Sequence, residues 1–254
     1  YLLVLNLDKR ALLLTSPGKS EAVQQWLCGF IFFQDDVTLQ AATTELGQYG
    51  LYGAQASSVA SQLAGAASKL PPHHALPLGE SAWLLRGAAP AGFGYELVAT
   101  PPLMEKCIAR TMEAGAVVAP AGLHELLRVE AGLPGAGHEI DASFIPLEVG
   151  LREAISFNKG CYTGQEIIAR MDARGKLAKT IVGLRAQQQL PVGAALRAAG
   201  SIAGVVTSSV HSPRLGWIGL GMLKPTVAGS GVKLAVGDSE PALQATVTAL
   251  PFDS

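Results

Sequence analysis

The last third of the chain is a series of short β-type segments that are separated by glycine, proline and aspartate. Short strands with turn residues at such close spacing are typical of a small antiparallel barrel. We therefore expect a C-terminal β-barrel domain at residues 177–254, after a boundary near Gly175 to Lys179. The six predicted strands cover residues 181–184, 195–197, 202–208, 217–222, 232–235 and 244–250.

The first two thirds of the chain alternate between strand and helix patterns. The order strand, helix, strand, strand, helix is most of a ferredoxin-like split βαβ unit, which predicts an α+β sheet with helices on one face. We expect an α+β region at residues 1–176 with two sub-units, about 1–44 and 45–176, and a further segment upstream of Tyr1. Predicted strands are 1–5, 37–39, 45–52, 82–86 and 95–99, the last two joined by the turn Gly92-Phe93-Gly94. One predicted helix begins at Ser16-Pro17, and three others cover residues 54–64, 101–114 and 120–130.

Charge and composition exclude several classes of function. The 254 residues include 19 Lys and Arg against 20 Asp and Glu, and no basic cluster marks a nucleic-acid surface. Three cysteines are too few and too far apart for a disulfide framework or a CxxC metal site. Apolar runs are far shorter than a membrane span. We expect a soluble monomer in a reducing compartment, with no metal site and no general binding to nucleic acid or membrane.

Residues 159–166, with the sequence Lys-Gly-Cys-Tyr-Thr-Gly-Gln-Glu, form the densest motif in the chain. Thr163 and Glu166 stand three residues apart just before the apolar pair Ile167-Ile168, which is the spacing of a helix capping box. One interpretation of the motif is therefore purely structural, since it can simply begin a helix.

The second interpretation of the same motif is a reactive thiol. Cys161 would stand directly before a helix N-terminus and two residues after Lys159, and both the helix dipole and the ammonium favour a thiolate. Free cysteines are more often small buried apolar residues. Cys28 and Cys107 lie among apolar neighbours and are predicted to be core residues of that ordinary kind.

The octet resembles the signature K-G-C-[YF]-x-G-Q-E of the YgfZ family, which is similar to the T-protein of the glycine cleavage system. It matches the signature at every fixed position. The resemblance implies a T-protein-like fold and a location in the bacterial cytoplasm or, in a eukaryote, the mitochondrial matrix. Further segments that resemble the superfamily are residues 92–97, 127–132, 137–141, 145–151, 208–213 and 218–221.

Proteins of this superfamily bind tetrahydrofolate in a central cavity, so the resemblance implies a folate site. Glu96 is the candidate for the pterin ring, because one carboxylate can accept two parallel hydrogen bonds from adjacent donors. Arg128 is the candidate for the anionic glutamyl tail or for orienting the pocket. The candidate aromatic walls of the pocket are Tyr95, Phe93 and Trp83.

Structural alternatives exist for each of these polar side chains. Glu96 could be an edge-strand carboxylate in solvent, and Arg128 could be a surface cation paired with Glu125 or Glu130 on its own helix. Three further carboxylates are interpreted as scaffold groups that accept backbone N–H groups in the loop-rich linker. These three are Glu130, Asp141 and Glu148.

The resemblance implies two functions that share one fold. The first is a tetrahydrofolate-binding factor that assists assembly or repair of iron–sulfur enzymes, including enzymes that modify tRNA, through Cys161 with Lys159 beside it. The second is an aminomethyltransferase, which moves a one-carbon unit from a lipoyl-bound methylamine to tetrahydrofolate. Such transferases carry a similar turn without the cysteine, so Cys161 favours the first. A third class is a scaffold that has lost its ligand.

Overall fold

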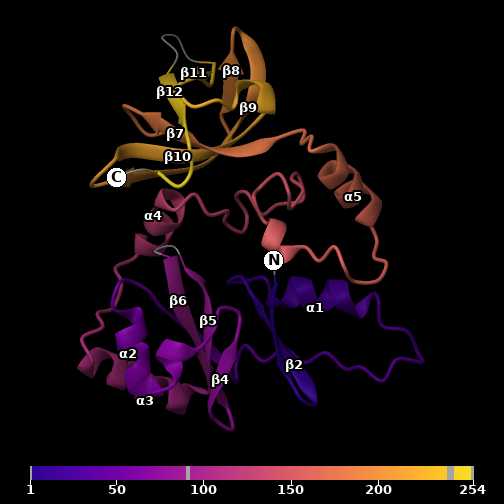
Figure 1. The fold of residues 1–254 in the computed structure, drawn as a ribbon, viewed down its shortest axis with the longest axis vertical. Coiled ribbons are helices and arrows are strands. Elements are labelled where there is room, and N and C mark those ends of the chain that lie inside the picture. Colours follow the sequence, from indigo (N-terminus) through magenta and orange to yellow (C-terminus); the bar gives the residue numbers. More distant parts are fainter. Residues whose placement is uncertain (1, 90–91, 239–242, 253–254) are drawn as a thin grey trace. The chain divides into compact units, whose positions relative to one another are not determined.

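The computed structural model describes residues 2–89, 92–238 and 243–252 (Figure 1). The chain forms two compact units, residues 1–119 and residues 120–254. Within the described ranges, every helix is too short or too polar to traverse a lipid bilayer. The predicted domain division at residues 176 and 177 stays a prediction.

A four-stranded antiparallel sheet organises the first unit, and helices α2 and α3 run along it in Figure 1. Because successive side chains of a strand point to opposite faces, the two faces carry different sets of apolar residues. Leu84 and Leu97 pack with the helices on one face, and Trp83 and Val98 pack with a two-stranded hairpin on the other. The strand order is β3 (Gly47–Leu51), β6 (Gly92–Ala99), β5 (Ala82–Ala89) and β4 (Ala75–Gly79). The helices are α2 (Ala56–Leu63) and α3 (Pro101–Glu113), and the hairpin is β1 (Leu2–Leu7) with β2 (Arg10–Thr15).

The connection between the hairpin and the sheet differs from the prediction. Helix α1 (Ser20–Cys28) begins three residues after Pro17, because Gly18 has a φ of 72° and no helix continues through a left-handed residue. The predicted strand at 37–39 is wrong, since this segment has no regular structure. A three-residue run forms a strand only beside a partner that takes its backbone hydrogen bonds.

Two smaller expectations about the first unit are also corrected. Cys28 is exposed at the end of α1 and is not a core residue, whereas Cys107 is half-buried and packs against the helix side of the sheet. Gly92 and Gly94 belong to β6 and not to a turn, because β5 and β6 pair up to Ala89 and Gly92. The connection itself, residues 90–91, lies outside the described residues.

The second unit contains the expected barrel, which is closed and has six antiparallel strands in the order β10-β7-β12-β11-β8-β9. Helix α4 (Leu123–Glu130) packs Val129 against Ile218 and Leu220 of the barrel wall. Gly219 permits close strand approach, because a Cβ there would lie 2.4 Å from the Ser208 carbonyl oxygen. The strands are β7 (Thr180–Ala186), β8 (Ala195–Ala198), β9 (Ser201–Ser212), β10 (Gly216–Leu223), β11 (Lys233–Val236) and β12 (Leu243–Thr248), and the remaining helix is α5 (Gln165–Arg174).

Candidate functional site

The Glu96 carboxylate lies on the face of the sheet that the helices leave uncovered. It is opposite Gly50 of β3 and Leu85 of β5, and it is half-buried. The Tyr52 hydroxyl donates to Glu96 Oε1 at 2.5 Å, and Gln48 Nε2 donates to Oε2 at 3.2 Å. Each carboxylate oxygen therefore holds one donor from the protein and retains a lone pair for another.

Tyr52 is held next to Glu96 by the backbone as well as by its hydrogen bond. A Cβ at Gly50 would lie 2.2 Å from the Tyr52 phenol oxygen, so only glycine leaves room for the ring. Burial raises the pKa of Tyr52 above its ordinary value, and the charge and hydrogen bond of Glu96 raise it further. The phenol therefore stays protonated and remains a donor to the carboxylate at neutral pH.

The candidate aromatic walls fall into different places. Trp83 lies on the same face as Glu96, 6% exposed, beneath the β1–β2 hairpin with Leu5. Tyr95 is 1% exposed on the opposite, helix-covered face, where its hydroxyl donates to the Ala67 carbonyl oxygen at 3.1 Å. Adjacent residues of a strand face opposite ways, so Tyr95 and Glu96 cannot line one pocket together. The side chain of Phe93 lies outside the described side chains.

Arg128 lies on α4 in the second unit and is 5% exposed. Its guanidinium donates to Glu125 at 2.9 and 2.5 Å and to Glu139 at 3.0 Å. It also donates to the Leu133 carbonyl oxygen at 2.6 Å and to Ser208 Oγ at 2.7 Å. These five bonds use all five N–H donors of a guanidinium. The pairing of Arg128 with Glu125 is as the structural alternative predicted, but the expected surface position is wrong, because the guanidinium is buried.

Glu139 completes the Arg128 cluster and was not identified from the sequence. It is 0% exposed, and it accepts hydrogen bonds from Arg128, from the Gly135 backbone N–H at 2.9 Å and from Ser208 Oγ at 2.7 Å. Burial lowers the pKa of Arg128, but the bonds and charges of Glu125 and Glu139 outweigh burial and raise it. No sequence pattern signals the contact between Glu139 and Ser208, because the two residues are 69 positions apart.

The three carboxylates interpreted as scaffold have partners of two kinds. Glu148 accepts the backbone N–H groups of Ile145 at 3.1 Å and Lys179 at 2.9 Å, and Asp141 accepts that of Ser143 at 2.8 Å. Glu130 differs, since its partners are side chains. Its oxygens accept from Ser212 Oγ at 2.6 Å and from Arg214 Nη2 at 3.0 Å.

The octet at residues 159–166 forms an exposed turn and then a helix. The capping box is not formed, because Gly164, with a φ of 90°, takes the N-cap position and no side chain caps the helix. Cys161 is exposed and stands four residues before Gln165, the first residue of α5, rather than directly at its start. The Lys159 ammonium lies 4.6 Å from the centroid of the Tyr162 ring. Cys161 and Lys159 stay predicted site residues.

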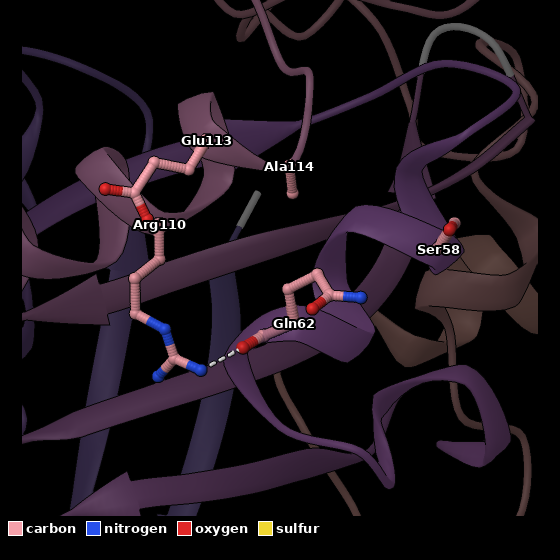
Figure 2. Close-up of a pocket in the computed structure, with 5 residues that line it drawn as sticks. All are labelled: Ser58, Gln62, Arg110, Glu113 and Ala114. Atoms are coloured by element: carbon pink, nitrogen blue, oxygen red, sulfur yellow. Dashed lines mark hydrogen bonds between the residues drawn. The ribbon is translucent and has the colours of Figure 1, made fainter.

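A hollow of about 240 Å³ lies between α2 and α3, away from these candidates (Figure 2). Figure 2 shows Arg110 of α3 reaching the main-chain carbonyl of Gln62, which it caps at the end of α2. Ser58, Glu113 and Ala114 complete its lining. In the described part of the chain, no three His, Cys, Asp or Glu side chains gather as metal ligands.

Comparison with known proteins places this fold and these residues in a family. The profile of the GCVT N-terminal domain matches residues 2–159, and the profile of the glycine cleavage T-protein C-terminal barrel domain matches residues 179–253. The chain therefore belongs to the glycine cleavage T-protein family.

Three relatives show how far the similarity extends. A putative chloroplastic transferase of Arabidopsis thaliana is 27% identical over 96% of this chain and 57% of its own length. An aminomethyltransferase of Moorella thermoacetica is 33% identical over 62% of this chain and 44% of its own. The crystal structure of glycine cleavage system aminomethyltransferase T from Bartonella henselae has a TM-score of 0.84 at 20% identity, over 99% of this chain and 71% of that one. The chain thus spans about half the length of the first two relatives.

Proposed function

We propose that this protein binds tetrahydrofolate and that Glu96 accepts the hydrogen bonds of the pterin ring. Tetrahydrofolate is the ligand of the T-protein family in general. The observation that carries the proposal is the environment of the Glu96 carboxylate. It is half-buried, its two donors are uncharged side chains, and it forms no ion pair among the described residues.

The chemistry of the pterin suits such a carboxylate. The ring presents adjacent N–H donors, and a carboxylate can accept two of them in parallel with one on each oxygen. A carboxylate already paired with an arginine would offer less charge to the ligand. Trp83 shares the face of the sheet with Glu96 and stays a candidate wall for the ring.

Arg128 supports the proposal as an orienting residue. Its five donors are taken by groups of the protein, so binding of a glutamyl tail would require it to give up an existing bond. Its contact with Ser208 joins α4 to strand β9. Arg128 is therefore proposed to hold α4 and the barrel in a fixed relation within the second unit.

The binding proposal is tested by thermal unfolding with tetrahydrofolate under nitrogen. A ligand that binds only the folded state adds about 2.7 kcal/mol at a concentration of 100 Kd, which raises Tm by roughly 5–10 °C for a chain of this size. Glu96→Gln should remove this shift, because it replaces the acceptor charge with an amide of the same shape. Glu45→Gln, an exposed carboxylate of the same unit, is the matched control and should keep the shift. No shift in the unaltered protein would overturn the proposal.

The finer part of the proposal concerns Cys161. We propose that the folate-bound protein assists assembly or repair of iron–sulfur enzymes, including enzymes that modify tRNA, through this thiol. Its exposure on the turn before α5 supports access by a client protein. Cys161→Ser should abolish support of iron–sulfur enzyme activity in cells that lack the native protein, while Cys28→Ser, at another exposed cysteine, should retain it. Equal activity of both variants would assign the thiol no role.

An aminomethyltransferase is the second candidate, because relatives that match 62% and 95% of the chain carry that name. Formation of methylenetetrahydrofolate from a lipoyl-bound methylamine by the purified protein would establish it. The cysteine variants separate the two candidates, since the transferase turn carries no cysteine and Cys161→Ser should leave transfer intact.

A further inference from the structure

The side chain of Tyr52, which directly follows β3, meets that of Glu96 in β6 at a position that the sequence does not mark. They are separated by 44 residues, and Gly50 lies directly across from Glu96 in the register. A Cβ at Gly50 would lie 2.2 Å from the phenol oxygen, so the missing side chain is the space that the Tyr52 ring fills. The glycine and the tyrosine thus form one arrangement around the carboxylate.

The Tyr52 hydrogen bond is of the strong, charge-assisted type. Its O···O distance of 2.5 Å is at the short end of the range for a hydroxyl and a carboxylate. Gln48 donates to the other oxygen at 3.2 Å, so the carboxylate is held from both oxygens. Two contacts of this kind restrict rotation of the Glu96 carboxylate, which would otherwise be free about its last torsion.

We propose that Tyr52 is a positioning residue that fixes the Glu96 carboxylate so that its two open lone pairs face the paired N–H donors of a pterin. This inference rests on the proposed folate binding. An ionised carboxylate has about four lone-pair sites, of which Tyr52 and Gln48 occupy two. Preorganisation of the remaining sites removes an ordering cost that the ligand would otherwise bear. Tyr52 therefore contributes to affinity through Glu96 without touching the ligand.

The opposite outcome has a clear physical basis and is part of the test. If the Tyr52 hydroxyl occupies the place of a ligand donor, its removal frees Glu96 and strengthens binding. If Tyr52 positions Glu96, its removal weakens binding. Tyr52→Phe decides between the two, since it deletes one oxygen and keeps the ring.

The experiment is calorimetric titration of the full chain under nitrogen with tetrahydrofolate and with 6-methyltetrahydropterin, which lacks the tail. Tyr52→Phe should weaken both ligands by the same factor, about tenfold for one charge-assisted hydrogen bond. Gly50→Ala should give a similar loss, because it displaces the phenol while keeping all its atoms. Tyr49→Phe, on the helix-covered face of the same strand, is the matched control and should bind as the unaltered protein does.

Loss of a positioning contact should appear in the titration as a less favourable binding entropy at unchanged stoichiometry, because the ligand must then order Glu96. A merely structural effect would instead lower the fraction of the protein that binds. Unchanged or tighter binding by Tyr52→Phe, or a loss confined to the ligand with the tail, would overturn the inference. Absence of binding by the unaltered protein would instead overturn the proposed function, and this inference with it. Titration of the unaltered protein therefore distinguishes the two failures.

Discussion

Two carboxylates in this protein, Glu96 in the first unit and Glu139 in the second, are held in contrasting ways. Glu96 is half-buried and receives one neutral side-chain donor on each oxygen. Glu139 is fully buried and receives a guanidinium, a backbone N–H and a hydroxyl. The first has spare acceptor sites and no cationic partner among the described residues, while the second is paired with Arg128. The difference separates a carboxylate suited to a ligand from one that serves the fold.

The comparison also shows why buried charge is a poor guide to function by itself. Arg128 and Glu139 are the most buried ionisable pair of the described residues, yet their hydrogen bonds are satisfied within the protein. A buried pair is costly to break, because the remaining partner is left charged without compensation. A ligand would have to break such bonds before using either group.

The largest expected effect comes from breaking the buried pair. Arg128→Met should lower the free energy of unfolding by about 3–5 kcal/mol, because Glu139 then lies buried without its cation. Urea denaturation of the full chain measures this loss. Arg214→Met is the control. Arg214 pairs with Glu130 but its side chain is 57% exposed, so its loss should cost less than about 1 kcal/mol.

A second substitution sharpens the same prediction. Adding Glu139→Gln to Arg128→Met should restore part of the lost stability, because the buried charge is then removed along with its partner. If the double variant is no more stable than the single one, the loss at Arg128 comes from packing and not from the uncompensated carboxylate. In that case neutralising the buried charge of Glu139 contributes little to stability, and Glu139 differs less from Glu96 than their hydrogen-bond partners indicate.

The sequence predicts much of the fold and little of these contacts. All six barrel strands were located to within a few residues, because glycine, proline and aspartate mark the turns between them. The partners of the carboxylates lie far apart in sequence, as with Tyr52 and Glu96 or with Ser208 and Glu139. Local spacing carries no signal for such pairs.

Local patterns also fail where one backbone angle overrides side-chain preference. Thr163 and Glu166 have the spacing of a capping box, but the left-handed φ of Gly164 makes that glycine the N-cap. Cys28 has apolar neighbours in sequence, yet the side chains of Trp26 and Phe30 are themselves exposed and do not bury the thiol. Composition around a residue therefore predicts its burial only where the element has a partner.

An effect of intermediate size is expected at alkaline pH and concerns Tyr52. The folded-state pKa of Tyr52 is raised, so the folded protein keeps a proton that the unfolded chain releases above about pH 10. Its contribution to stability is therefore complete below about pH 10 and is lost as the pH rises further. Urea midpoints between pH 8 and pH 11 should fall more steeply for the unaltered protein than for Tyr52→Phe. Parallel curves would mean that the phenol is neither buried nor held by Glu96 in solution.

The smallest expected effect is at acid pH and belongs to Glu125 in the Arg128 cluster. The hydrogen bond from Arg128 lowers the pKa of Glu125, so this carboxylate stabilises the fold above its ordinary pKa, and the gain is lost as the pH falls through the lowered value. The Glu125 side chain is 38% exposed, and solvent screens the pair. Glu125→Gln should flatten the fall in urea midpoint between pH 6 and pH 3 slightly, and the exposed Glu153→Gln should leave it unchanged. If Glu125→Gln also leaves it unchanged, Glu139 alone balances Arg128, which would set this cluster still further apart from the neutral contacts of Glu96.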